Sequence, residues 1–484
     1  MDKNAKNVLE VDDMSVEFHT PSGVVHAVSH VTFHLKQGEI LGIVGESGSG
    51  KSVTANAIMR LLPDTAKITG SIKLNGRDIM SIPNREFNKI RGKDIAMIFQ
   101  DPMTSLNPLY TVGNQLVETL KLHMGLKGEA ARKRAIELLD MVSIPQPEVR
   151  FKQYPHEFSG GMRQRVMIAM ALACDPAILI ADEPTTALDV TIQAQILELM
   201  KELKNKVSAS IIMITHDLGI VSDLCDRVNV MYGSQLMETG TVDDLFYRTA
   251  HPYTRGLINA STGLNIVRDV WGIRPEVKVD KPHHSCPFYG RCTQSLPLCG
   301  QEAPELKDWG DGRLIACLRG GIITLLEGRD ISMAYGRQQV LDKVSLKVRS
   351  GEVVALVGRS GSGKTTLAGI LGGYLSDFQK GSLLFQGETA DMERLHRQEG
   401  GVQMVFQDSE TSLNPNMTVL QAVSEPRLLA KLGREEAAAV SALGDVGLPG
   451  EESFLKKKVK TLSGGQKQRV SIARALTMEP AVLL

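Results

Sequence analysis

The sequence predicts an α/β protein in which one domain occurs twice, because two kinds of segment are repeated along the chain. Residues 31–36 and 344–349 alternate apolar and polar side chains, as half-buried strands do. Each is followed by Gly-Glu and then by a short apolar stretch next to a glycine, at residues 40–44 and 353–357. Such stretches are typical of the buried parallel strands of α/β proteins.

Two motif pairs support the duplication. Ile-Phe-Gln-Asp at residues 98–101 has the counterpart Val-Phe-Gln-Asp at 405–408, and Phe-Ser-Gly-Gly at 158–161 has the counterpart Leu-Ser-Gly-Gly at 462–465. All the pairs keep their order along the chain at nearly constant spacing, so the differences are loop lengths. Self-similarity of this kind indicates a duplicated domain.

The domain boundaries follow from the repeat. We expect the first copy at residues 8–258 and the second at 322–484. Residues 259–321 between them are rich in Pro, Gly and Cys and show no helical periodicity. We interpret this segment as a small, separately stapled extension of the first copy.

Composition narrows the classes of function. Apolar residues make up 42% of the chain and charged residues 23%, as in ordinary globular proteins. Lys plus Arg equals Asp plus Glu, so there is no net basic field, and nucleic acid is not expected as a partner. No apolar run is long enough to span a bilayer and no secretory signal is visible, so a cytoplasmic location is expected.

Two glycine-rich loops predict phosphate binding. Residues 45–52 and 358–365 both fit G-x-x-x-x-G-K-[ST] between a predicted strand and a predicted helix. Glycine lets the backbone turn its N–H groups onto phosphate oxygens, and the following helix adds its positive end. A Gly/Ser-rich turn with a solvated lysine is the alternative, which two equivalent loops disfavour. The expected nucleotide-binding residues are Gly45, Ser47, Gly48, Gly50, Lys51 and Ser52 in the first loop, and Gly358, Gly361, Gly363, Lys364, Thr365 and Thr366 in the second.

Polar residues at the ends of two buried strands predict the catalytic groups. Asp182 and Glu183 follow the apolar run 177–181, and His216 follows the run 211–214. The carboxyl ends of parallel strands are where ligands bind in open α/β sheets. Asp182, with Ser52, is therefore expected to hold Mg²⁺, Glu183 to orient and deprotonate the attacking water, and His216 to contact the γ-phosphate. A solvated strand end and a structural histidine are the alternatives.

Together these motifs resemble the ABC ATPases. Asp182-Glu183-Pro184, Ala187-Leu188-Asp189 and His216 look like the Walker B motif, D-loop and switch histidine of that family. The resemblance implies an α/β nucleotide-binding fold with antiparallel β and α-helical subdomains, and ATP with Mg²⁺ as ligands. Further residues gain roles from it: signature-motif residues Ser159, Gly160, Gly161, Ser463, Gly464, Gly465 and Gln466, Q-loop residues Gln100 (also toward Mg²⁺) and Gln407, and adenine-stacking residues Phe18 and Tyr335.

The resemblance covers nearly the whole chain and is greatest to the oligopeptide, dipeptide and nickel importer ATPases. Residues 99–108, the His-Pro-Tyr-Thr run at 251–254 and the cysteine-bearing tail from Cys286 are typical of that subgroup. It implies two domains that close head-to-tail around two ATP molecules, each phosphate loop completed by the other copy's signature serine at a helix N-terminus. The implied partners are two membrane-spanning permease subunits at the cytoplasmic face and an extracytoplasmic binding protein.

The two copies differ at two points. Met162 stands where the signature motif usually carries Gln, whereas the second copy has Gln466; this is not interpreted as a dead site. The second copy reaches Leu484 inside its Walker B strand, without counterparts of Asp182, Glu183 or His216. We therefore expect at most one hydrolytic site in the chain as written, and favour a fragmentary sequence or frameshifted gene over a designed half-site.

Four cysteines lie at C-x5-C-x6-C-x17-C spacing, namely Cys286, Cys292, Cys299 and Cys317. A cytosolic location argues against disulfides, and four thiolates can hold zinc or an iron–sulfur cluster. Spacing alone does not separate these, because the usual C-x2-C zinc pattern is absent. The resemblance points to a [4Fe–4S] cluster, with zinc or metal-free packing cysteines as alternatives.

Two rival functions stay open. One is a soluble ABC ATPase that acts on ribosomes or DNA, and the other is a regulator that binds nucleotide without hydrolysing it. The cargo is also open: peptides are the first expectation, and nickel, metal chelates and glutathione are alternatives.

Overall fold

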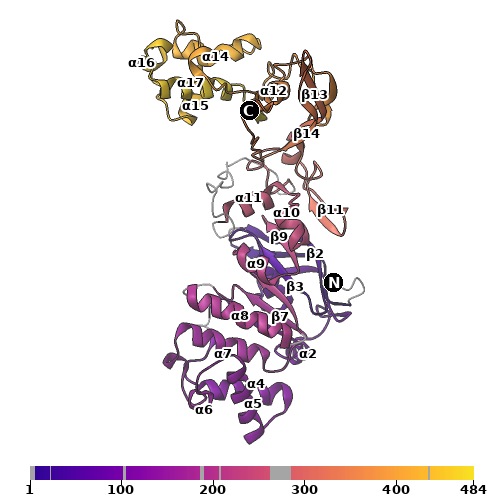
Figure 1. Ribbon diagram of the computed structural model, residues 1–484. Coiled ribbons are helices and arrows are strands. Elements are labelled where there is room, and N and C mark those ends of the chain that lie inside the picture. Colours follow the sequence, from indigo (N-terminus) through magenta and orange to yellow (C-terminus); the bar gives the residue numbers. More distant parts are fainter. Residues whose placement is uncertain are drawn as a thin grey trace. The chain divides into compact units, whose positions relative to one another are not determined.

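The computed structural model describes residues 6–21, 23–101, 105–185, 190–206, 209–261, 285–433 and 436–484. The chain divides into two compact units, Met1–Gly321 and Ile322–Leu484 (Figure 1). No helix within the described ranges is long and apolar enough to cross a membrane.

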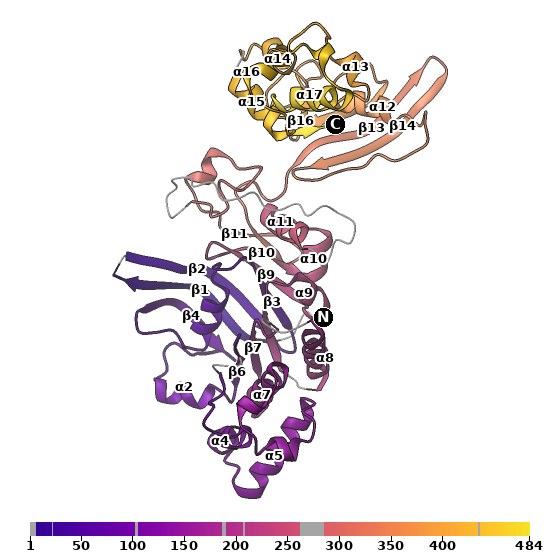
Figure 2. The same ribbon diagram turned by 90° about the vertical axis from the view of Figure 1, so that its left-hand side faces the viewer.

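The first unit contains two sheets. An antiparallel sheet has the order β2-β1-β4-β5, and Figure 2 shows β1 and β2 as a long hairpin. A larger, mainly parallel sheet has the order β11-β12-β10-β9-β3-β8-β7-β6. The strands are β1 (Asn7–Thr20), β2 (Gly23–Lys36), β3 (Ile40–Val44), β4 (Ala66–Leu74), β5 (Arg77–Asp78), β6 (Ile95–Ile98), β7 (Ile178–Asp182), β8 (Ser210–Ile214), β9 (Arg227–Tyr232), β10 (Gln235–Thr241), β11 (Leu306–Gly310) and β12 (Arg313–Ala316).

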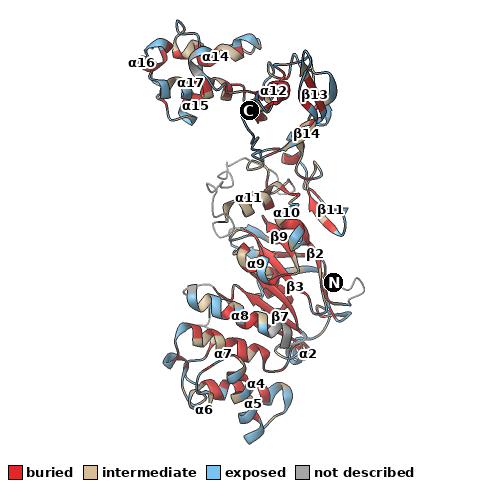
Figure 3. Ribbon diagram, viewed as in Figure 1, coloured by how far each residue is buried: buried red, intermediate tan, exposed pale blue. Residues whose placement is uncertain are grey.

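Both faces are buried along the parallel strands of the larger sheet, as Figure 3 shows. Successive residues of β3 alternate between two cores: Ile40 belongs to the core with helices α4, α5 and α7, and Leu41 to the core with the antiparallel sheet and α1. Strands buried on both faces read as continuous apolar runs, which explains the sequence pattern. The helices are α1 (Lys51–Ile58), α2 (Asn84–Ile90), α4 (Val112–Met124), α5 (Gly128–Met141), α6 (Pro147–Arg150), α7 (Gly160–Leu172), α8 (Val190–Lys206), α9 (Leu218–Leu224), α10 (Val242–Tyr247) and α11 (Pro252–Ala260).

The cysteine-bearing segment is joined to the first unit's sheet. Strand β12 pairs antiparallel with β10, and β11 pairs with β12. None of the six cysteines, all of which lie in the described part of the chain, forms a disulfide. Backbone hydrogen bonds between β12 and β10 thus join this segment to the first unit. Its expected stapling through the cysteines stays a prediction. Cys174 and Cys225 are buried in the core of the first unit.

The second unit repeats the antiparallel sheet in the order β14-β13-β15-β16 and has a parallel pair, β17-β18. Its helices α14, α15 and α17 share an apolar core. The elements are β13 (Thr324–Tyr335), β14 (Gln338–Arg349), α12 (Lys364–Leu371), β15 (Lys380–Phe385), β16 (Glu388–Thr389), β17 (Val402–Gln403), α13 (Ser409–Ser412), α14 (Val419–Leu429), α15 (Glu436–Asp445), α16 (Glu452–Leu455), α17 (Gly464–Leu476) and β18 (Val482–Leu483).

One predicted strand does not form. Residues 353–357, the counterpart of β3, are not a strand, and the side chain of Val357 is 92% exposed. In the first unit β3 lies between β8 and β9, which follow the phosphate loop in the chain. Among the described residues of the second unit, no strand pairs with 353–357, so this apolar run has no neighbour to bury it.

Candidate functional site

The first phosphate loop joins β3 to α1. Gly48 and Gly50 have φ of +77° and +99°, a region that favours glycine. A Cβ atom on Gly50 would lie 2.5 Å from the carbonyl oxygen of Ala27, so the second glycine also permits a close approach of two backbones. The loop conformation is thus encoded in the glycine spacing.

Lys51 lies at the centre of this loop. Its Nζ donates to the carbonyl oxygens of Gly45 and Glu46, both at 2.9 Å, and its side chain is buried. Burial lowers the pKa of Lys51, while the carboxylates of Glu183 and Asp182 oppose that shift. The Lys51 amine therefore lies among oxygen atoms of the loop and of the nearby carboxylates.

Ser52 and Asp182 form a pair that fits a magnesium ion. The Ser52 hydroxyl donates to Asp182 Oδ1 at 3.0 Å, across 130 residues of sequence. Asp182 ends strand β7 and is buried, and burial raises its pKa although the Ser52 hydrogen bond lowers it. A hydroxyl and a carboxylate beside a phosphate loop are the oxygen ligands that Mg²⁺ takes in nucleotide sites.

The three residues predicted to act in hydrolysis lie together. Gln100 Nε2 donates to Glu183 Oε2 at 2.9 Å, and His216 Nδ1 lies 3.3 Å from Glu183 Oε1. Glu183 has a φ of +45°, and its backbone N–H donates to Ile214 at 2.9 Å. A non-glycine residue in this region stores strain that the surroundings must hold, which is common at functional sites. One carboxylate therefore joins the ends of β6, β7 and β8.

The second loop repeats the first one locally. Lys364 Nζ donates to the carbonyl oxygens of Gly358 and Arg359 at 2.9 and 2.8 Å. Gly361 and Gly363 have φ of +77° and +89°. Among the other predicted residues of this unit, Thr365 and Thr366 lie in the first turn of α12, and Gln407 is exposed after β17.

The two signature serines are helix N-caps, as predicted. The hydroxyl of Ser159 accepts the Met162 N–H at 3.4 Å at the start of α7, and that of Ser463 accepts the Gln466 N–H at 3.3 Å at the start of α17. Gln466 Oε1 in turn accepts the Ser463 N–H at 3.1 Å, which completes a capping box that Met162 cannot form. Gly160, Gly161, Gly464 and Gly465 occupy the first turns of these two helices.

The remaining predicted site residues make none of the contacts given above, or they lie outside the described residues. Ser47 is exposed in the first loop, and Phe18 is half-buried on β1, where it packs against the core. Tyr335 is exposed at the end of β13. Adenine stacking on the two aromatic residues stays a prediction. The predicted D-loop, residues 187–189, lies outside the described residues.

Comparison with protein families shows to which family the chain belongs. The model of the ABC transporter family matches residues 28–186 and 341–484, which include both phosphate loops and both signature motifs. This chain belongs to the ABC transporter family. A second model, for the C-terminal region of oligopeptide/dipeptide transporters, matches residues 237–299. The protein is thus an ABC ATPase with duplicated nucleotide-binding domains, which couples ATP hydrolysis to transport.

Several curated proteins resemble this ABC ATPase along almost its whole length. It is 39% identical to the oligopeptide transport ATP-binding protein OppD of Mycobacterium tuberculosis, over 98% of this chain and 85% of OppD. It is 42% identical to the peptidoglycan transport ATP-binding protein YejF of Agrobacterium fabrum, over 99% of this chain and 82% of YejF. It is 40% identical to the glutathione import ATP-binding protein GsiA of Salmonella typhimurium, over 99% of this chain and 77% of GsiA.

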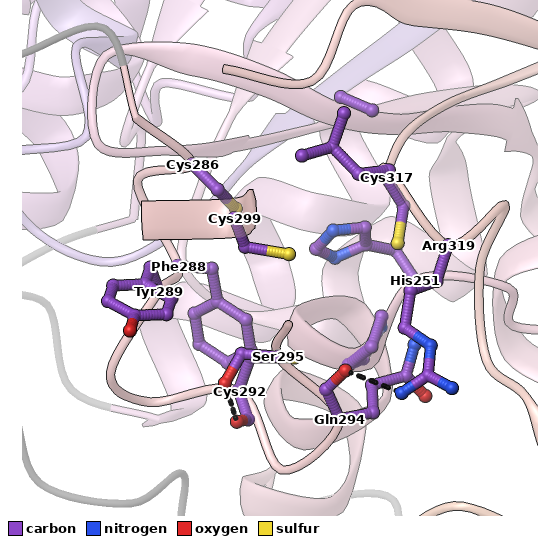
Figure 4. A pocket seen from close by; sticks show the side chains of 13 residues that line it. His251, Cys286, Phe288, Tyr289, Cys292, Gln294, Ser295, Cys299, Cys317 and Arg319 are labelled. Atoms are coloured by element: carbon purple, nitrogen blue, oxygen red, sulfur yellow. Dashed lines mark hydrogen bonds between the residues drawn. The ribbon is translucent and has the colours of Figure 1, made fainter. Parts of the chain in front are cut away.

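The four clustered cysteines of the ABC ATPase line one cavity with His251 and Phe288. In Figure 4 the sulfur atoms of Cys299 and Cys317 point into the space beside the His251 ring. Burial raises the pKa of Cys286 to about 11, and that of Cys292 likewise. Burial lowers the pKa of His251 to about 4, so its ring is neutral.

The cysteines do not surround a single point. Within the described ranges, no group of three or more His, Cys, Asp or Glu side chains is arranged to hold a metal ion. A single zinc ion would need four ligand atoms within about 2.3 Å of one centre. Four free thiols that line one cavity are the donor type that zinc and iron–sulfur clusters share.

Sequence reasoning missed one contact at the first phosphate loop. Arg291, from the cysteine-bearing segment, forms an ion pair with Glu46 of the loop. The two residues are 245 positions apart, so no local pattern links them. The difference between Glu46 and Arg359 at equivalent positions of the two loops is the sequence signal that could have drawn attention to this site.

Proposed function

We propose that this ABC ATPase energises the import of short peptides or peptide-like molecules, with ATP hydrolysed at the first phosphate loop. The observation that carries the assignment of the hydrolytic site is the contact of Gln100 and His216 with the two oxygens of Glu183. The cargo class is supported by the match of residues 237–299 to a region of oligopeptide/dipeptide transporters, and by the relatives named for oligopeptide and glutathione transport.

Each residue of the first site has a proposed role. The loop N–H groups and Lys51 bind the β- and γ-phosphates, and the Lys51 amine exchanges its two carbonyl partners for phosphate oxygens. Ser52 and Asp182 hold the magnesium ion, which supplies charge neutralisation of the phosphates when bound. Glu183 accepts a proton from the attacking water, and Gln100 and His216 orient its carboxylate.

A groove beside Gln100 supports a docking role toward the membrane subunits. Its apolar lining includes Met59, Met97, Phe99 and Met170, and the Phe99 side chain is exposed. We assign this groove to an amphipathic helix of a permease subunit, because methionine-rich grooves adapt to apolar helix faces. Gln100 follows Phe99 directly, so a movement of the docked helix reaches the Glu183 carboxylate.

The remaining proposed partners follow from this docking. Two membrane-spanning permease subunits place the ATPase at the cytoplasmic face of the membrane as a peripheral subunit. A binding protein on the other side delivers the cargo. The import and transport roles named for the relatives support this arrangement.

The cysteine cavity supports a separate proposal, a [4Fe–4S] cluster held by Cys286, Cys292, Cys299 and Cys317. The supporting observation is that four free thiols line one cavity. Anaerobic purification followed by iron, sulfide and zinc analysis tests it. About four iron and four sulfide per chain is the expected result, and metal below half an equivalent would overturn the proposal.

The test of the proposed function compares two matched variants in the complex with its permease subunits in lipid vesicles. Lys51→Ala should abolish peptide-stimulated ATP hydrolysis, because Lys51 lies beside the carboxylates of Glu183 and Asp182. Lys364→Ala should retain more turnover. ATP binding without hydrolysis in the wild type would instead favour a regulator, and salt-sensitive binding to nucleic acid would favour a soluble ABC ATPase.

A further inference from the structure

The cysteine-bearing segment holds the first phosphate loop by an ion pair. Arg291 Nη1 donates to Glu46 Oε2 at 2.8 Å, and Arg291 Nη2 donates to Glu46 Oε1 at 3.1 Å. The Arg291 side chain is only 13% exposed. A bidentate pair with a largely buried guanidinium is geometrically specific and stronger than a fully solvated surface pair.

An aromatic cluster fixes both members of this pair. The backbone N–H of Glu46 donates to the hydroxyl of Tyr253 at 3.0 Å, and Arg291 donates to the hydroxyl of Tyr232 at 3.0 Å. The rings of Tyr232 and Tyr253 lie 4.6 Å apart, and Phe288 packs edge-on against both. We call the Glu46–Arg291 pair with Tyr232, Tyr253 and Phe288 the clamp. It joins the phosphate loop, β9, α11 and the cysteine-bearing segment.

Phe288 connects this cluster to the cysteine cavity. Its ring lines that cavity together with Cys286 and Cys292, and Cys292 is the neighbour of Arg291 in sequence. A rearrangement of the cavity would therefore move residues that contact Tyr253 or carry the guanidinium. The clamp and the cavity form one packed unit.

The clamp also sets the charge at the phosphate site. Glu46 lies close enough to Lys51 for its carboxylate to affect the lysine electrostatically, and its carbonyl oxygen accepts a hydrogen bond from Lys51. An unpaired carboxylate at this position would repel a bound polyphosphate. Arg291 neutralises that charge and directs the Glu46 side chain toward the cysteine-bearing segment.

The second loop shows that this clamp is not needed to form the loop itself. Arg359 occupies the position of Glu46, and Lys364 donates to its carbonyl oxygen just as Lys51 does to that of Glu46. The local fold thus accepts either charge at this position. The ion pair serves to link the first loop to the segment beside it.

We propose that Arg291 is a positioning residue of the first ATP site: by holding Glu46 it keeps the phosphate loop in its binding conformation and removes a repulsive charge. The cysteine-bearing segment thereby acts on ATP affinity. This inference rests on the proposed function in one respect, namely that the first loop binds ATP.

The experiment measures Mg–ATP affinity and steady-state hydrolysis of the full chain in a Lys364→Ala background, so that the first loop dominates the signal. Arg291→Ala should raise Kd and KM for ATP about tenfold and change kcat by less than about threefold. Arg291→Lys keeps the positive charge but loses the two-pronged guanidinium. Its Kd for ATP should therefore lie between that of Arg291→Ala and that of the parent. The control is Arg134→Ala, because Arg134 also contacts both carboxylate oxygens of its partner, Asp175, but does not line this cavity.

A charge exchange provides the rescue. Glu46→Arg creates the residue that the second loop already carries, and Arg291→Glu places the acid on the segment. Each change alone breaks the ion pair and should weaken ATP binding, and the double variant should restore affinity to within about threefold of the parent. ATP affinity in Arg291→Ala that equals that of Arg134→Ala, or a double variant that binds ATP as weakly as Arg291→Glu alone, would overturn the inference. Failure of the Lys364→Ala parent to bind ATP would instead overturn the proposed function.

Discussion

The two phosphate loops have the same local conformation in different surroundings. Their second and third motif glycines adopt positive φ in both copies, and each lysine donates to two carbonyl oxygens of its own loop. Lys51 is buried and lies close to Asp182 and Glu183, whereas Lys364 bonds to carbonyl oxygens in an exposed loop. The loop is therefore a local structure, and the site around it is a tertiary one.

The strands before the loops differ in the same way. Strand β3 is fully buried between β8 and β9, but the equivalent residues 353–357 are exposed and unpaired with any strand in the described part of the second unit. An apolar run becomes a strand only when neighbours satisfy its backbone groups. The phosphate-loop motif thus specifies the loop's own conformation, whereas the strand before it forms only where neighbouring strands pair with it.

The largest effect is expected from Glu183→Gln. Removing the proposed general base should lower ATP turnover about a thousandfold, while ATP affinity stays close to that of the wild type because Gln keeps the side-chain size. Phosphate release and nucleotide binding measure the two quantities. Glu479→Gln is the control, since Glu479 has the same φ of +45° in the second unit. ATP turnover in Glu183→Gln above a tenth of the wild-type value would show that hydrolysis does not depend on the first site.

The next largest effect is expected on the free energy of unfolding, when one ion pair is broken in each unit. Glu238 is 0% exposed and pairs with Arg313 at 3.1 Å, whereas Arg427 pairs at 2.8 Å with the half-exposed Glu399. Arg313→Ala leaves a buried carboxylate unpaired and should lower the free energy of unfolding of the first unit by about 4 kcal/mol. Arg427→Ala should lower that of the second unit by about 1 kcal/mol. Urea unfolding, followed by hydrogen exchange in each unit, measures the two losses in free energy of unfolding. Equal losses in the two variants would contradict this prediction.

Acid should destabilise the first unit through His251. Its pKa of about 4 lies below that of an unfolded histidine, about 6.5, so the folded chain binds a proton less readily than the unfolded one. The stability from this group is complete above pH 6.5 and is lost as the pH falls toward 4, by about 3 kcal/mol.

The measurement for this prediction is the urea midpoint of the first unit across that pH range. His251→Asn should flatten the pH dependence, because it removes the titrating group. His396→Asn in the second unit is the control and should leave the first unit's profile unchanged. A profile that keeps its slope in His251→Asn would assign the acid sensitivity to other groups.

The smallest effect concerns the two signature helices. Gln466 completes a capping box with Ser463, and Met162 cannot do this for Ser159. Met162→Gln should stabilise α7 by about 0.5 kcal/mol, and Gln466→Met should destabilise α17 by a similar amount. Thermal melting of the two variants is the test, and shifts of the same sign would contradict the capping explanation.

Much of the fold could be predicted because the sequence patterns that encode it span only a few residues each. The Gly-x-x-Gly-x-Gly-Lys spacing predicts the loops, the apolar runs predict β3, β7 and β8, and the signature serines predict two helix N-caps. The cysteine-bearing segment was predicted less well. Its strands β11 and β12 join the sheet through partners some 75 residues earlier in the chain, on β10.

The sequence by itself determined the duplicated domains, the family and the residue types around ATP, because glycine dihedrals, caps and strand periodicity are encoded within a few residues. Only the tertiary structure decided which side chains meet. Glu183 meets Gln100 across 83 residues, and Glu46 meets Arg291 across 245. Such contacts arise when packed strands and helices bring distant segments together, and no local pattern records the partner.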